Sequence, residues 1–226
     1  VIKNADKLNL VGMTKSVNDL ATRARDNKLK PDEIQGGTYK KWYGLEYYFV
    51  DWEYSGFRVI NNYDENEYLK SRPQNIKFYN KEGLTYSYMA QGNMNVRYMN
   101  NSIFDVSGTS IFCHDDVNIY LIQSLLNSRF ATYLLRLLSQ DIKFQPGTVS
   151  KLSVPPIREI TNENYMIMLA RKLIELKRYL SKNTLTEYIY YPNVHTTNKK
   201  QLMINILNVT VTTLILESML NEIIFN

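Results

Sequence analysis

The spacing of apolar residues changes near residue 117, and this change divides the chain into a strand-rich part and a helical part. Before it, short apolar and aromatic runs separated by glycines predict strands at 45–52, 57–60, 76–79, 83–89, 96–98, 103–106 and 110–112. After it, apolar residues recur three and four positions apart, which predicts helices within 116–140, over 165–180 and from 201 onward. We therefore predict an α+β fold, in which a mostly antiparallel, sheet-rich body is followed by packed α-helices.

Polar and proline-containing stretches divide the chain into three segments. Residues 1–30 are mixed and polar, and read as an N-terminal connector with a short helix that Ser16 could cap. Residues 31–158 form the sheet-rich body and its first helices, and end in an extended Pro155-Pro156 stretch. Residues 159–226 form a C-terminal helical region. Its last helix is apolar almost all round, so we expect it to be packed on several sides.

Composition limits the partners that this chain can have. The net charge is +5 and the sequence pI is about 9.0, which favours a polyanion over a basic partner. A single cysteine, Cys113, forbids an internal disulfide and fits a reducing, cytoplasmic location. The longest apolar stretch, 209–220, is too short and too polar to span a bilayer, so no membrane partner is expected. Because the chain opens on Val1 and stops inside an apolar run, we expect it to be part of a longer protein.

The residue patterns of common enzyme sites are missing from the sequence. The two histidines, His114 and His195, lie far apart, and one cysteine cannot build a zinc site. There is no phosphate-binding glycine loop followed by Lys-Ser/Thr, no G-x-S-x-G and no G-x-G-x-x-G. We therefore predict no catalytic, metal-binding or cofactor-binding residue in this chain, and the chemistry that remains is recognition.

The strongest recognition signal is the glycine-bracketed run 36–44, which places two lysines among aromatic residues. Lys40 and Lys41 are candidates for phosphate contacts, and Trp42 and Tyr43 offer ring faces to bases. The alternative is an edge strand in which Trp42 is buried and the lysines are merely solvated.

Further candidates for nucleic-acid contacts are basic and amide side chains between 72 and 151. Arginine reads guanine, and asparagine or glutamine reads adenine, through paired hydrogen bonds. The candidates for base edges are Arg72, Gln74, Asn75 and Gln145, and the further candidates for phosphates are Arg72, Lys77, Arg97, Arg129, Lys143 and Lys151. The alternative is that Arg72 and Arg97 form structural ion pairs with the carboxylates at 64–67.

Several of these segments together resemble, in the same order, blocks of PglX-type adenine-specific DNA methyltransferases of BREX phage-defence systems. The resemblance is good over about residues 30–157, loose at the C-terminal end, and poor at 1–30 and 183–215. The matching segments are 37–44 (GTYKKWYG), 48–52 (YFVDW), 71–75 (SRPQN), 81–87 (KEGLTYS), 97–98 (RY), 103–105 (IFD), 125–129 (LLNSR), 154–155 (VP) and 220–225 (LNEIIF).

In this family the resembling region is the C-terminal target-recognition domain, so the resemblance implies that residues 31–158 recognise double-stranded DNA. The family's catalytic half lies upstream, binds S-adenosylmethionine and carries an Asn-Pro-Pro-Tyr motif, which this chain lacks. The resemblance therefore implies the DNA-reading part of a methyltransferase without its chemistry. The implied partners are double-stranded DNA and the upstream methyltransferase domain, and S-adenosylmethionine is expected only in the parent enzyme.

Two other functions fit the sequence. The chain could be half of a type I restriction specificity subunit, although such a subunit has two recognition domains and only one such unit is visible here. It could also be a protein-interaction module without nucleic-acid binding, with the last helix and the apolar stripe at 165–180 as its partner surface.

Overall fold

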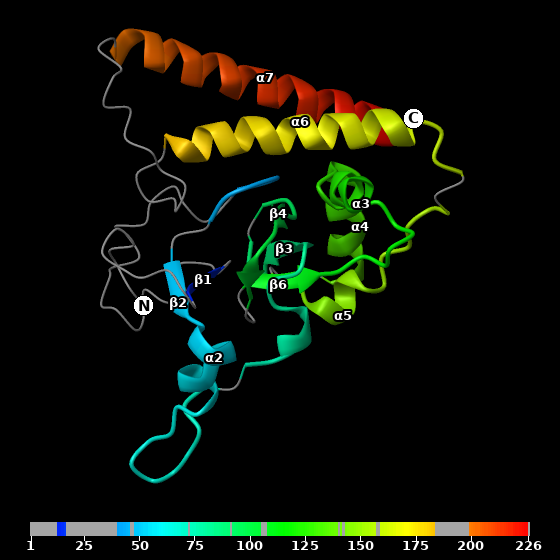
Figure 1. Ribbon diagram of the computed structural model, residues 1–226. Helices are drawn as coiled ribbons and strands as arrows, with labels where there is room; N and C mark the ends of the chain where they lie inside the picture. The colour runs from blue at the N-terminus through cyan, green and yellow to red at the C-terminus, as the bar shows by residue number, and fades with distance from the viewer. Residues whose placement is uncertain are drawn as a thin grey trace.

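A small antiparallel sheet occupies the middle of the structure, and two long helices lie side by side above it and above helix α3 (Figure 1). This computed structural model describes residues 13–16, 40–45, 48–71, 73–90, 92–104, 108–139, 141, 143–156, 159–183 and 199–225. The strands are β1 (Met13–Ser16), β2 (Tyr48–Asp51), β3 (Gly83–Ser87), β4 (Val96–Met99), β5 (Ser102–Ile103) and β6 (Gly108–Ile111). The helices are α2 (Glu53–Ile60), the 3₁₀ turn η3 (Ile76–Phe78), α3 (Ile119–Leu126), α4 (Arg129–Leu138), α5 (Pro146–Val149), α6 (Glu163–Lys182) and α7 (Lys199–Phe225).

The central sheet has the order β4-β3-β6, and both pairings are antiparallel. Leu84 of β3 faces Tyr98 on one side and Ile111 on the other. Every residue of β3 is buried, as expected of a central strand that is covered on both faces. This sheet and the helices that follow it confirm the predicted α+β fold class; the boundaries at 30 and 158 stay predictions.

A second sheet has the order β2-β1-β5, in which β1 is antiparallel to β2 and parallel to β5. The pairing of Met13 with Asp51 ties the N-terminal segment to β2. The sequence did not predict this strand, because 13–16 is short and its polar neighbours carry no alternating pattern. The helix predicted to begin at Ser16 falls outside the described residues.

Two predicted strands are wrong. Residues 57–60 belong to α2, because Tyr54, Ser55 and Gly56 all have positive φ angles and turn the chain into a helix instead of a hairpin. Glycine is required at position 56, since a Cβ there would lie 2.7 Å from the Trp52 ring. Residues 76–78 form the 3₁₀ turn η3, which Asn75 enters in the left-handed conformation.

The change of periodicity near residue 117 does mark helices, and the region predicted to be helical at 116–140 is divided at Asn127 and Ser128 into α3 and α4. The cap of α3 is Asn118, whose side chain accepts from the Tyr120 N–H. Ser128 caps α4 by accepting from the Ala131 N–H.

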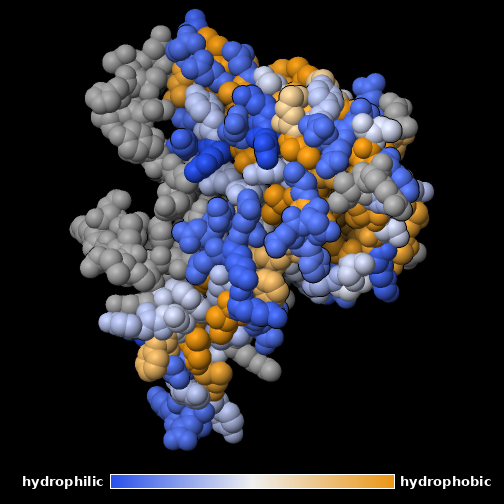
Figure 2. Space-filling model, turned by 45° about the vertical axis from the view of Figure 1, so that its right-hand side comes forward, coloured by the Kyte–Doolittle hydropathy of each residue, from blue (hydrophilic) through white to orange (hydrophobic). Residues whose placement is uncertain are grey.

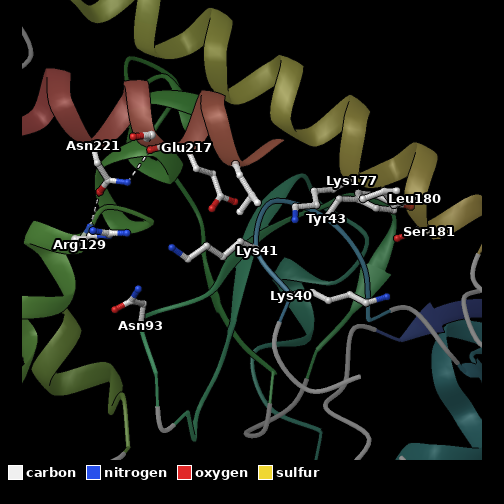
Figure 3. A pocket seen from close by; sticks show the side chains of 12 residues that line it. Lys40, Lys41, Tyr43, Asn93, Arg129, Lys177, Leu180, Ser181, Glu217 and Asn221 are labelled. Carbon is white, nitrogen blue, oxygen red and sulfur yellow. Dashed lines mark hydrogen bonds between the residues drawn. The ribbon is translucent and has the colours of Figure 1, made fainter. Parts of the chain in front are cut away.

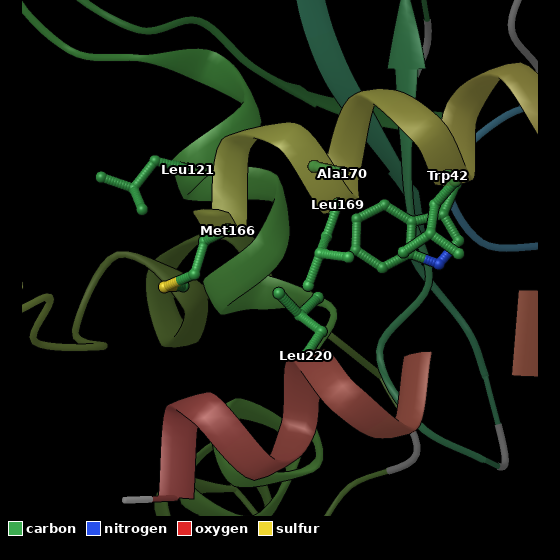
Figure 4. Packing of buried hydrophobic residues seen from close by; sticks show 7 residues of the cluster. Trp42, Leu121, Met166, Leu169, Ala170 and Leu220 are labelled. Carbon is green, nitrogen blue, oxygen red and sulfur yellow. The ribbon is translucent and has the colours of Figure 1, made fainter. Parts of the chain in front are cut away.

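The long helices α6 and α7 close one side of the core. Met166, Leu169 and Leu173 of α6 pack with Leu220 of α7 and with Trp42, all of them nearly fully buried (Figure 4). Four residues at helical spacing on α6, which are Met166, Leu169, Ala170 and Leu173, are thus core residues, as expected of an amphipathic helix. A second cluster fills the space between the sheet, α3, α4 and the segment at Phe144.

The buried Asn127 amide joins the helices to the sheet. Its Nδ2 donates to the Val96 carbonyl and its Oδ1 accepts from the Val96 N–H, both at 2.8 Å. Gln123 reinforces this link by donating to the same carbonyl at 3.2 Å and to the Trp42 carbonyl at 3.1 Å. Because these backbone groups are buried, and the Val96 carbonyl also accepts from the Trp42 N–H at 2.9 Å, the two amides complete the hydrogen bonding of β4 at this point.

We expect Asn127→Ala to lower the free energy of unfolding by about 2 kcal/mol, because it leaves the buried Val96 N–H without its acceptor and removes one of the three donors to the Val96 carbonyl. Asn164→Ala, which truncates an exposed asparagine on α6, is the control and should change stability by less than about 0.5 kcal/mol. Urea unfolding followed by circular dichroism measures both. Equal midpoints for the two variants would contradict this role of Asn127.

Candidate nucleic-acid interface

The segment 40–45 runs beside β4 and is joined to this edge strand of the central sheet by backbone hydrogen bonds at Trp42. The Trp42 N–H donates to the Val96 carbonyl at 2.9 Å, and the Tyr98 N–H donates to the Trp42 carbonyl at 2.8 Å. Trp42 and Leu45 have positive φ angles of 72° and 67°. This unusual backbone lets both side chains enter the core from a single short segment.

Trp42 is a core residue and not a stacking platform. Its side chain is 1% exposed, and its ring packs among Leu169, Leu173 and Leu220. Its Nε1 donates to Glu217 Oε1 at 2.8 Å, which satisfies the indole inside the core. The prediction that Trp42 stacks on bases is therefore wrong, and the alternative of a buried Trp42 is confirmed.

Tyr43 and Arg97 are also interior residues. Tyr43 is 5% exposed, and the Arg178 guanidinium lies 5.8 Å from the centre of its ring. Arg97 is 1% exposed and donates to Ser87 Oγ at 3.2 Å and to the Asn95 carbonyl at 3.1 Å. In this structure Arg97 supports the sheet and does not reach the surface, so it is not available to a phosphate.

A cleft of about 450 Å³ opens where segment 40–45, the start of α4, the end of α6 and α7 meet (Figure 3). Its lining includes Tyr43, the amides of Asn93 and Asn221, and one carboxylate, that of Glu217. Four cationic side chains line it: Lys40, Lys41, Arg129 and Lys177. Cations thus outnumber carboxylates four to one, which makes the cleft electropositive. We call these four residues and Glu217 the cationic cleft.

Lys41 is the buried member of the cationic cleft. Its Nζ donates to the Asn127 carbonyl at 3.0 Å, and its side chain extends into the space between Arg129 and Asn93 (Figure 3). Burial lowers the pKa of Lys41; Glu217 opposes this, and the positive charges of Arg129 and Lys177 lower the pKa further. An anion bound here would relieve that repulsion, so the cleft is suited to a negatively charged ligand.

Arg129 is held in place through α7. Its backbone N–H donates to Asn221 Oδ1 at 2.8 Å, and Asn221 Nδ2 donates to the Glu217 carbonyl at 2.7 Å. Lys177 reaches the same cleft from the last turns of α6. The three cations around Lys41 therefore come from separate parts of the chain.

The other predicted contact residues do not join the cationic cleft. Gln74, Asn75 and Lys77 are exposed at η3, which lies across the central sheet from segment 40–45 (Figure 1). Lys143 is half-buried in a bridge to Met89, and Gln145 is exposed where α5 begins. Arg72 falls outside the described residues. The roles of these residues in DNA binding stay predictions.

Sequence reasoning missed Lys177, Asn93, Asn221 and Glu217 as site residues. Nothing in the spacing of a single helix shows which of its charges will face a distant loop. The one available signal was the segment LLNSR at 125–129: its asparagine holds Lys41, and its arginine enters the cleft.

Within the described ranges, no group of three or more His, Cys, Asp or Glu side chains could hold a metal ion. One described helix segment, Lys200–Phe225, has the length and composition to cross a membrane, which the shorter stretch 209–220 did not suggest. Its C-terminal half is fixed to the core through Glu217 and Leu220. The expectation of no membrane partner stays a prediction.

Comparison with known proteins gives two different similarities. The adenine-specific methyltransferase BrxX of Escherichia coli O9:H4 (strain HS) is 27% identical over 166 residues, which cover 72% of this chain and 13% of BrxX. The adenine-specific methyltransferase PglX of Lacticaseibacillus casei (strain Zhang) is 31% identical over 134 residues, which cover 56% of this chain and 11% of PglX. The chain is therefore related to BREX-type adenine-specific methyltransferases and spans about an eighth of their length.

The first forty residues are similar to a different family. The family model for the catalytic domain of 2-oxoacid dehydrogenase acyltransferases matches residues 1–40. The dihydrolipoyllysine-residue acetyltransferase component of the pyruvate dehydrogenase complex of Mycobacterium tuberculosis (strain CDC 1551 / Oshkosh) is 49% identical over 39 residues, 17% of this chain and 7% of that protein. This similarity was not anticipated from the sequence. The acyltransferase similarity covers residues 1–40, whereas the resemblance to the methyltransferases is poor at 1–30 and begins at about residue 30.

We expect Glu217→Gln to strengthen binding to a polyanion, because it removes the only carboxylate that lines the cleft in the described structure while its amide oxygen can still accept from Trp42. The variant should leave a heparin column at higher salt than the parent chain. Glu175→Gln removes an equal charge from the exposed face of α6 and is the control. An equal shift for both variants would show that net charge, and not the cleft, controls retention.

Proposed function

We propose that this chain recognises double-stranded DNA in a sequence-specific way, as the recognition part of a BREX-type adenine-specific methyltransferase. The observation that carries the proposal is the cationic cleft, in which four cations surround a single carboxylate. Similarity to the two adenine-specific methyltransferases supports a nucleic acid as the polyanion, because adenine is a nucleic-acid base, and the resemblance to PglX-type DNA methyltransferases favours DNA. The basic pI of the chain agrees with this partner.

In this proposal the cleft holds the DNA backbone. A phosphate placed beside Lys41 would meet Arg129 on one side and Lys177 on the other, and would replace the repulsion among them by charge-assisted hydrogen bonds. Such contacts fix register but carry no sequence information. Base reading therefore needs a neighbouring side chain, and Asn93 at the rim of the same cleft has the amide that pairs with adenine.

The proposal assigns methyl transfer to another part of the parent protein. The chain spans only 11 to 13% of its methyltransferase relatives and contains no Asn-Pro-Pro-Tyr motif. S-adenosylmethionine would bind to that other part. Besides DNA, that part would be the second partner of this chain. We propose that the chain acts in the cytoplasm. We propose no acyl transfer, because the acyltransferase similarity covers only 7 to 9% of those relatives.

The direct test is a fluorescence anisotropy titration of the chain with labelled duplex DNA at low salt. Saturable binding that weakens steeply with added salt supports the proposal. No binding at low salt would overturn it and would favour a protein-interaction module instead.

We expect Lys177→Ala to weaken binding to every duplex sequence and to reduce the slope of log affinity against log salt by about one, as for the loss of one phosphate contact. Lys172→Ala removes the same charge from the same helix at an exposed position that pairs with Glu175, outside the cleft. Its slope should match that of the parent. Identical slopes for the two variants would argue against the cleft as the phosphate site.

We expect Asn93→Ala to reduce discrimination between a selected duplex and its single-base variants by roughly tenfold at one position, with little effect on the salt slope. Asn100→Ala, at an exposed asparagine that directly follows β4, is the control. Competition binding measures both. Discrimination unchanged by Asn93→Ala would mean that bases are read elsewhere, for instance by Gln74 and Asn75, without affecting the proposed phosphate contacts.

A further inference from the structure

The first two-thirds of α7 present an apolar face that nothing in the described structure covers. Hydrophobic side chains reach the surface among hydrophilic ones at the top of the molecule, where α6 and α7 lie (Figure 2). Six large side chains of α7, each 41 to 70% exposed, form this face: Met203, Ile204, Leu207, Val211, Leu214 and Ile215. We call these six residues the α7 seam.

The α7 seam lies opposite the face that α7 uses inside its own domain. At 100° per residue, its six side chains fall within an arc of about 120°. Thr213 and Leu220, which are buried, point to the other side of the helix, and Leu216 packs with them against the core. A helix that is apolar on both sides is normally covered on both sides. Within the described ranges, the seam side of the first two-thirds of α7 therefore has no neighbouring element.

The spacing of the seam is symmetric along the helix. Met203, Ile204 and Leu207 lie six, five and two positions before Val209, whereas Val211, Leu214 and Ile215 lie two, five and six positions after it. Two α7 helices that cross antiparallel at the level of Val209 would bring each residue opposite its counterpart. Self-complementarity of this kind is what a two-fold symmetric interface requires.

Charge also permits this pairing. Between Gln201 and Leu216 the helix carries no charged residue, so two seams meet without like-charge repulsion. In the same register, Lys200 of one copy lies level with position 218 of the other, next to Glu217. Six half-exposed side chains would bury on the order of 500 Å² per copy, below the roughly 800 Å² of a standard interface. The association is therefore expected to be weak and reversible.

We propose that the α7 seam is a self-association surface, through which two copies of this chain pair with their α7 helices antiparallel. Self-association through the α7 seam does not depend on DNA binding. Leu207 and Val211 lie at the centre of the seam and outside the cationic cleft, which makes them suitable for a test. Leu214 lines both surfaces and is left unchanged in the test.

The first test is sedimentation velocity of the chain over a wide range of concentrations. The parent chain should pass from monomer to dimer, and Leu207→Glu should weaken dimerisation by on the order of 100-fold, because it would bury an unpaired carboxylate. Leu207 is exposed in the monomer, so the Leu207→Glu variant should keep the circular dichroism spectrum of the parent. Thr212→Glu adds the same charge at an exposed position outside the seam and should still dimerise.

The second test checks the register by disulfide cross-linking in a Cys113→Ser background. A mixture of Leu207→Cys and Val211→Cys chains should form heterodimers faster than either chain alone forms homodimers. In the antiparallel register, residue 207 of one copy lies level with residue 211 of the other, whereas the two copies of the same residue lie about 6 Å apart along the axis. Preferential homodimers would overturn the antiparallel register.

Two other occupants of the seam would give different results. If the seam serves another part of a longer polypeptide, the parent chain will stay monomeric at every concentration. If it serves a bilayer, the parent chain will bind phosphatidylcholine vesicles and Leu207→Glu will not. Either result would overturn self-association.

Discussion

The structure depends on a buried amide–backbone contact. Asn127 lies where α3 gives way to α4, and it bonds both backbone groups of Val96 in β4 while its own carbonyl accepts from Lys41. One residue thus joins the helices, the central sheet and the segment that carries the cationic cleft. Such a contact is stable only while it is complete, because every group in it is buried. The position of Lys41 therefore follows from the contact between Asn127 and Val96 that joins the helices to the sheet.

The closing of the core also explains the aromatic and basic run near residue 40. Trp42 closes the core under α6 and α7, and its bond to Glu217 places a carboxylate at the edge of the cleft. Lys40 and Lys41, which precede Trp42, then line the cleft, where Arg129 and Lys177 add further positive charge. The aromatic residues that looked like base-stacking groups position the cations instead. The aromatic residues thus have the structural role, and the neighbouring lysines have the proposed binding role.

The sequence predicted the α+β class and the helices at 119–138, 163–182 and 199–225 well, because apolar periodicity reports which face of a long helix is covered. It failed at 57–60 and 76–79, where positive φ angles at Tyr54–Gly56 and Asn75 override strand propensity. The candidate site was only partly predictable. Lys40, Lys41 and Arg129 were named in advance, but burial of Trp42 and Arg97, and the approach of Lys177, follow from long-range packing that no local pattern encodes.

The most direct test of the central claim is the titration of the Lys41 ammonium, followed by NMR of lysine labelled at Cε, with and without duplex DNA. In the chain alone, burial and the neighbouring cations hold the pKa of Lys41 below its ordinary value. A phosphate bound in the cationic cleft stabilises the charged form, so saturating DNA should raise that pKa and binding should take up a proton at high pH. Saturable DNA binding that leaves the titration of Lys41 unchanged would place the DNA elsewhere and contradict the account.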